Sequence, residues 1–211
     1  MESRIYKLYL KLRKKHGQSS QYWPQWCSRR KTKRTRERIA IGAILTQRTS
    51  WHNADLAIQN LAKRNLFSVD KISKLKTPEK LIPLIRAAGF YQSKPKRLYD
   101  LCCFISQEKG VNNLRKQGAN VLRQKLLSIS GVGPETADTI LVYALDKPSF
   151  VIDEYTKRLV KSRGLSNNFN YNYLKNLFEK NLPKSVSLYQ DFHALIIVEQ
   201  KGEKESIMKQ R

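Results

Sequence analysis

Helical periodicity of the apolar residues is the feature that most restricts the fold of this chain. Apolar side chains recur at steps of three and four residues, the spacing that places them on one face of an α-helix. This pattern covers residues 39–61, 81–88, 98–105, 121–129, 134–145, 173–178 and 186–198. Alternating strand patterns with hairpin signals are absent from the sequence. We therefore expect an all-α fold.

The charge balance indicates a polyanionic partner. The 211 residues include 41 Lys and Arg against 17 Asp and Glu, a formal net charge of +24. Such an excess repels itself in a compact protein, and an anionic partner relieves that repulsion. The basic residues are dense at Arg29–Arg38. A solvated basic tail is the alternative, but the excess continues through the rest of the chain, so we expect nucleic acid.

Several other classes of protein do not fit the composition. No run of about 18 apolar residues exists for a membrane span, and charges interrupt residues 1–17 where a signal peptide would be apolar. The three cysteines, Cys27, Cys102 and Cys103, form no Cys-x-x-Cys spacing. An iron–sulfur cluster needs four thiolates. We expect a cytoplasmic protein without a metal, an iron–sulfur cluster or another cofactor.

A glycine-containing turn joins two of the expected helices. Gly131-Val132-Gly133 follows the helical pattern of 121–129, and Pro134 suits the first position of the next helix. Glycines allow close backbone approach, and the N–H groups of the second helix face the turn. Together these groups could bind a DNA phosphate. A glycine turn without a ligand is common in helical hairpins and stays open as the alternative.

Asp153 directly precedes another expected helix. An aspartate at this place is typical of an N-cap, whose carboxylate accepts hydrogen bonds from the first helical N–H groups. Those N–H groups also keep the carboxylate ionised and oriented. A fixed anion of this kind could stabilise positive charge on a sugar during cleavage of a glycosidic bond. Capping alone and catalysis with capping both remain possible at this point.

The ordered motifs resemble the helix-hairpin-helix DNA glycosylase superfamily, which includes endonuclease III. The resemblance rests on residues 41–47, 89–98, 126–138 and 150–159 and covers roughly residues 36–200. It implies two helical lobes, a hairpin that grips DNA and an active site in the groove between the lobes. We expect one lobe at 36–147, with the hairpin, and the other at 1–35 plus 148–211, with Asp153 as the catalytic carboxylate.

The residue at position 135 bears on strand cleavage. Endonuclease III-type enzymes use a lysine in the second hairpin helix to form a Schiff base with the sugar. Glu135 matches that position, and a carboxylate cannot form an imine. The four-cysteine cluster loop of endonuclease III proteins has no counterpart here. The resemblance therefore implies a monofunctional enzyme without lyase activity.

Within the superfamily the sequence is most similar to bacterial 3-methyladenine DNA glycosylases of the III type. Tyr22-Trp23-Pro24 matches their aromatic-Trp-Pro signature, and Gln47–Trp51 matches their glutamine loop with a following aromatic. Tyr22, Trp51 and Arg48 depart from the usual Trp, Phe and Asn. The resemblance implies a base pocket built from Tyr22, Trp23, Pro24, Trp51 and Lys201, of which the lysine is modified in relatives.

Three DNA contacts are expected besides the pocket. Gly131–Gly133 would hold a phosphate, Gln47 would fill the gap that a flipped base leaves, and Lys157 would contact the backbone. The aromatic residues could equally be ordinary core packing, Gln47 a polar loop residue and Lys201 a solvated charge.

The sequence thus predicts a monomeric glycosylase of base excision repair that acts on double-stranded DNA containing a damaged base. Its substrate would be an alkylated purine such as 3-methyladenine, because a cationic base is attracted to electron-rich rings. One alternative is an endonuclease III-like glycosylase for mismatched or oxidised bases. Another is a non-catalytic helix-hairpin-helix DNA-binding protein, and an RNA-associated protein is a distant fourth.

Overall fold

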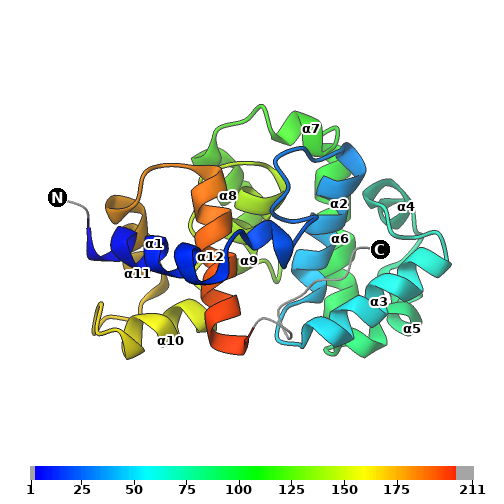
Figure 1. The fold of residues 1–211 in the computed structure, drawn as a ribbon. Helices are drawn as coiled ribbons and strands as arrows, with labels where there is room; N and C mark the ends of the chain where they lie inside the picture. Colours follow the sequence, from blue (N-terminus) through cyan, green and yellow to red (C-terminus); the bar gives the residue numbers. More distant parts are fainter. Residues whose placement is uncertain (1–2, 203–211) are drawn as a thin grey trace. The chain divides into compact units, whose positions relative to one another are not determined.

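The computed structural model describes residues 3–202, and every regular element in that part of the chain is a helix (Figure 1). The expected all-α fold is therefore confirmed. The backbone divides into two compact units. Unit 1 takes in the described parts of Met1–Arg30 and Asp146–Arg211, and unit 2 takes in Lys31–Leu145. In residues 3–202 no helix combines the length and the hydropathy needed to cross a bilayer.

Unit 1 is built around one long buried helix, α12, which contacts α1, α10 and the short helix η1. An aromatic cluster packs against α12, and in it the rings of Phe150 and Phe178 stack at 4.6 Å between centroids. Phe192 of α12 adds its ring at 5.7 Å from Phe150. The elements of the unit are α1 (Arg4–His16), η1 (Ser19–Gln21), α10 (Glu154–Ser162), α11 (Tyr171–Asn181) and α12 (Val186–Lys201).

Unit 2 is centred on α2, whose residues from Ile39 to Leu45 are buried. This helix contacts α3, α6 and the π-helical segment η4. The elements are α2 (Lys33–Leu45), α3 (Trp51–Lys63), α4 (Val69–Ser73), η2 (Pro78–Leu81), α5 (Ile82–Ile85), η3 (Arg86–Ala88), α6 (Lys94–Gln107), α7 (Val111–Leu114), α8 (Ala119–Leu127), α9 (Pro134–Thr139) and η4 (Ile140–Ala144).

Local chemistry explains where several of these helices begin. The Thr32 side chain accepts a hydrogen bond from the backbone N–H of Thr35 and starts α2, and Ser50 does the same for α3. Hydroxyl side chains are favoured at this N-cap position because they satisfy a helical N–H group. The apolar pattern of 39–61 is consequently interrupted at 46–50, and Gln47 lies in that turn.

The second hairpin helix changes its winding partway. Pro134 opens α9 as expected, and the chain continues from Ile140 as a π-helix to Ala144. The Ala144 carbonyl accepts a 2.7 Å hydrogen bond from the buried guanidinium of Arg36. This bond satisfies a carbonyl at the end of the helix that has no partner in a regular helix. It fixes the hairpin helix to α2.

Candidate active site

Asp153 caps α10 in unit 1. Its backbone is extended, and its Oδ1 accepts a 2.7 Å hydrogen bond from the backbone N–H of Thr156. The side chain is buried, with 8% of the residue exposed. A carboxylate at this place also lies at the positive end of the helix dipole. The structure therefore gives Asp153 the N-cap role that its position in the sequence suggested.

The second carboxylate oxygen of Asp153 faces α12. Oδ2 lies 3.4 Å from Nε2 of His193, which is also buried. Burial by itself would raise the pKa of Asp153, but the attraction of His193 and the hydrogen bond from Thr156 outweigh it, and the pKa is lowered. The carboxylate is thus ionised at neutral pH. The sequence alone suggested a helix cap or a salt bridge for His193 but no catalytic role, and its partner lies 40 positions away.

The aromatic signature of the N-terminal segment lies in the same unit. Trp23 is buried, and its ring meets that of His193 edge to face at 6.0 Å between centroids. The hydroxyl group of Tyr22 donates a 3.1 Å hydrogen bond to the His16 carbonyl, and Pro24 follows in a turn. Through His193, Trp23 is thus connected to the carboxylate of Asp153.

Lys201 ends α12 and contacts the helix that Asp153 caps. Its Nζ lies 5.2 Å from the centre of the Tyr155 ring, within cation–π range. The neighbouring Gln200 donates a 3.3 Å hydrogen bond to the Tyr155 carbonyl. Lys157, the expected DNA contact on α10, forms an ion pair with Glu154 at 2.7 Å.

The glycine turn of the hairpin lies in unit 2. Gly131 has a φ of 80°, the left-handed conformation that favours glycine, and a Cβ there would come 2.4 Å from the side chain of Arg97. Val132 is buried, and Gly133 is the N-cap of α9. A side chain at position 131 would therefore displace Arg97 and strain the backbone, and the glycines leave the backbone of the turn accessible.

An ion pair holds the two hairpin helices together. Arg123 of α8 donates to both carboxylate oxygens of Asp138 of α9, at 2.9 and 3.1 Å. The Asp138 side chain is fully buried. Paired hydrogen bonds between a guanidinium and a carboxylate are strong and directional. By joining α8 to α9, this ion pair fixes the geometry of the turn between them.

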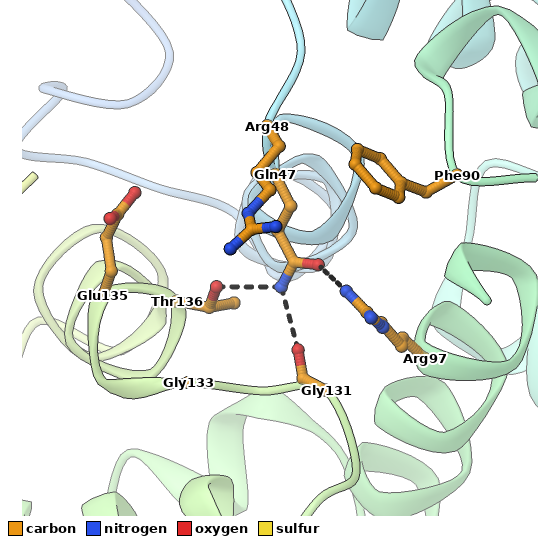
Figure 2. Close-up of a pocket in the computed structure, with 8 residues that line it drawn as sticks. All are labelled: Gln47, Arg48, Phe90, Arg97, Gly131, Gly133, Glu135 and Thr136. Carbon is orange, nitrogen blue, oxygen red and sulfur yellow. Dashed lines mark hydrogen bonds between the residues drawn. The ribbon is translucent and has the colours of Figure 1, made fainter. Parts of the chain in front are cut away.

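Gln47 is tied to the hairpin by its side chain, as Figure 2 shows. Its Nε2 donates to the Gly131 carbonyl at 3.1 Å and to Oγ1 of Thr136 at 2.9 Å. Its Oε1 accepts a 3.2 Å hydrogen bond from Arg97. In this structure the amide of Gln47 thus connects the glycine turn, α9 and α6. To enter the gap left by a flipped base, the side chain would have to release these hydrogen bonds.

These groups line an open hollow of about 350 Å³. Arg48 and Phe90 lie on its rim, each with a left-handed backbone (φ 48° and 49°), and Phe90 is 49% exposed. Such strained backbones are common at functional sites. Glu135, on the first turn of α9, also lines the hollow (Figure 2). Trp51 is the half-buried first residue of α3 in this unit, whereas Tyr22 and Trp23 belong to unit 1.

Sequence reasoning missed the group that fixes the Gln47 turn. Lys94 of α6 is fully buried, and its ammonium donates to the carbonyls of Leu45, Gln47 and Ala88 at 3.0, 2.9 and 2.8 Å. Burial and the nearby Arg97 lower the pKa of Lys94 to about 8. A lysine in the first turn of a helix is usually exposed, so only the folded structure identifies this contact.

The comparisons with known proteins agree with this arrangement. Residues 41–184 match the model of the HhH-GPD superfamily base excision DNA repair proteins. A Methanocaldococcus jannaschii protein, MJ1434, named as a DNA repair glycosylase, is 44% identical over 92% of this chain and 85% of its own length. The endonuclease III of Thermotoga maritima is 29% identical over 60% of this chain and 56% of its own.

The solved structures include a close match in fold. The H. pylori 3-methyladenine DNA glycosylase MagIII, determined with bound 1,N6-ethenoadenine, superimposes with a TM-score of 0.78. It is 26% identical in sequence, and the match covers 95% of this chain and 98% of that protein.

Proposed function

The chain belongs to the HhH-GPD superfamily of base excision DNA repair proteins, and we propose that this DNA glycosylase releases alkylated purines such as 3-methyladenine by hydrolysis. The observation that carries the proposal is the buried, ionised carboxylate of Asp153, capped onto α10 and paired with His193. The H. pylori relative, whose name gives 3-methyladenine as its substrate, supports the choice of base.

Asp153 supplies the electrostatic part of the reaction. Cleavage of an N-glycosidic bond leaves positive charge on the sugar, and a fixed carboxylate stabilises that charge without reorganising during the reaction. The N–H of Thr156 holds Oδ1 in place, which leaves the other oxygen near His193. An alkylated purine already carries positive charge and leaves readily, so the enzyme needs no strong acid to protonate it.

Aromatic rings would favour a cationic base over a neutral one. A well-placed ring attracts a cation by about 0.5–2 kcal/mol. Tyr22, Trp23, Pro24 and Trp51 are the candidates for this pocket, and Trp23 already contacts the partner of Asp153. Lys201, close to the Tyr155 ring, is the candidate basic group of the pocket.

Unit 2 would hold the DNA. Gly131–Gly133 exposes a backbone turn suited to a phosphate, and Gln47 and Phe90 lie beside it at the rim of one hollow. An exposed aromatic side chain on a strained loop can stack on bases next to the extruded nucleotide, which offsets part of the unstacking cost of a few kcal/mol. Lys157 of unit 1, paired with Glu154, would exchange that partner for a phosphate and add a DNA contact outside unit 2.

The strand would stay intact after base release. Glu135 lines the hollow beside the glycine turn, and it matches the position of the lyase lysine in endonuclease III-type enzymes. A carboxylate cannot form the Schiff base that strand scission requires.

The test is incubation of the protein with methylated duplex DNA. We expect free 3-methyladenine by chromatography, strands that break only after alkali, and no covalent complex after borohydride. A trapped complex would show that another amine supplies lyase chemistry. Release of an oxidised base instead would favour the endonuclease III-like alternative, and binding without release of any base would favour a non-catalytic protein.

A further inference from the structure

A second open hollow in unit 2 is lined mainly by basic side chains. It measures about 390 Å³ and is bordered by Lys33, Arg34 and Arg38 of α2 and by Lys71 of α4. Phe67, in the loop before α4, forms part of its floor. Nothing in the reaction at Asp153 uses these residues.

This basic hollow lies away from the hollow at the glycine turn. Three of its four cations come from the first half of α2 and Lys71 comes from α4, whereas Gln47 lies two positions beyond the last residue of α2. At 1.5 Å per residue, the 11 positions from Arg34 to Leu45, the last residue of α2, correspond to about 17 Å along the helix axis. The two hollows have no lining residue in common.

Two cations of the hollow, Arg34 and Arg38, lie close enough to interact. The guanidinium of Arg38 lies 4.7 Å above the centre of the Phe67 ring. Burial and, to a smaller extent, the neighbouring charge of Arg34 lower the pKa of Arg38, as expected where like charges come close together. Repulsion between two like charges destabilises this arrangement, and a bound anion would reduce that repulsion.

Among the described residues that line the hollow, one carboxylate is present, and it is already engaged. Glu37 is buried, accepts a 3.4 Å hydrogen bond from the backbone N–H of Val69, and lies 3.7 Å from the ammonium of Lys33. It offsets one positive charge out of four. The described lining of the hollow therefore keeps a net positive charge, and the flat guanidinium of Arg38 is held against the Phe67 ring.

We propose that the basic hollow binds the phosphates of a second duplex DNA segment while the glycine turn holds the first. Duplex DNA is the polyanion that a DNA glycosylase meets in excess, and guanidinium groups bind phosphate oxygens through paired hydrogen bonds. Two separate DNA-binding surfaces allow a protein to reach a new segment before it leaves the old one. The site needs no chemistry at Asp153, but the proposal rests on the proposed binding of the first duplex at the glycine turn.

The experiment counts duplexes per protein chain. Full-length protein is mixed with an excess of a fluorescent, undamaged 12-base-pair duplex, and sedimentation gives the composition of the complex. The variant Arg34→Gln/Arg38→Gln/Lys71→Gln removes three charges from the hollow. The matched control, Lys76→Gln/Lys80→Gln/Lys116→Gln, removes three exposed charges of unit 2 from outside it.

The unaltered protein and the control should each bind two duplexes, and the variant should bind one. Three phosphate contacts predict that the second association constant falls with salt with a slope of about −2.7, or about sixfold for each doubling of salt. We expect the variant to weaken the second binding step about tenfold or more and to leave the first within about twofold. Equal losses in variant and control, or a single duplex on the unaltered protein, would overturn the proposal.

Arg38→Lys separates a built site from diffuse attraction. Lysine keeps the charge but loses the flat, stacked guanidinium. We expect this single variant to weaken the second binding step severalfold, with the first unchanged. A lysine variant that binds the second duplex as the unaltered protein does would contradict the role of the Arg38–Phe67 pair.

Discussion

Replacement of Lys94 by methionine tests whether a buried ammonium holds the Gln47 turn in place. The change keeps the length of the side chain but removes the donor to the carbonyls of Leu45, Gln47 and Ala88. A buried acceptor without a partner costs about 1–3 kcal/mol. The lowered pKa, about 8 against an ordinary 10.5, implies that methionine relieves about 3 kcal/mol of ionic desolvation.

With about 2 kcal/mol lost at each carbonyl, the net decrease in the free energy of unfolding is about 3 kcal/mol. Urea unfolding followed by circular dichroism at pH 7 measures it. The control is Lys96→Met on the same helix, where the exposed lysine pairs with Asp100 and only a small loss is expected, because surface ion pairs contribute little to stability. Equal destabilisation by Lys94→Met and Lys96→Met would refute the reasoning.

The effect of pH on this variant has a definite sign. The pKa of Lys94 is lower in the folded protein, at about 8, than its usual 10.5, so the unfolded chain binds the proton more tightly between these values. Linkage then makes the unaltered protein gain stability as pH rises through that range, whereas methionine cannot titrate. The stability difference between the two proteins should therefore widen from pH 8 to pH 10. A difference that narrows would contradict the burial of a charged ammonium.

Three further outcomes are expected. Arg123→Ala removes the guanidinium that donates to both oxygens of the buried Asp138 carboxylate and should lower the free energy of unfolding by about 3–5 kcal/mol. Urea titration measures the loss, and a loss under about 1 kcal/mol would argue against this ion pair as the contact that holds the two hairpin helices together. Gly131→Ala places a Cβ against Arg97 at a positive φ, so binding of an undamaged duplex by fluorescence anisotropy should weaken about tenfold, and unchanged affinity would exclude the turn as a phosphate site. The pKa of Asp153 is lowered below its usual 3.8, so the carboxylate keeps its charge until the pH falls through that lowered pKa. The rate of base release, measured against pH, should therefore show no decrease above pH 5 that comes from protonation of Asp153. A decrease near pH 6 would have to come from another group.

The sequence predicted the parts of the molecule that local chemistry determines. The apolar spacing predicted the helices, the Gly-Val-Gly-Pro order predicted the hairpin, and the position of Asp153 predicted its N-cap geometry. Each of these depends on residues within a few positions of one another. The resemblance to helix-hairpin-helix glycosylases was likewise carried by short ordered motifs.

Contacts between distant positions could not be predicted in the same way. The Asp153–His193 pair joins residues 40 positions apart, and Lys94 meets Leu45 across 49. Gln47 lies 84 positions from Gly131, so the engagement of its amide with the hairpin needed the folded chain. A charged or amide side chain in a sequence gives no sign of which carbonyl it will reach.

The most direct test of the account is the single-turnover release of 3-methyladenine from methylated duplex DNA by Asp153→Asn. Asparagine keeps the size and the capping oxygen but removes the charge, so the protein should fold and bind DNA as well as before. We expect the rate to fall by about 100-fold or more, the usual loss when one electrostatic group of a transition state is removed. A rate within a few-fold of the unaltered enzyme would contradict the claim that the Asp153 carboxylate drives cleavage.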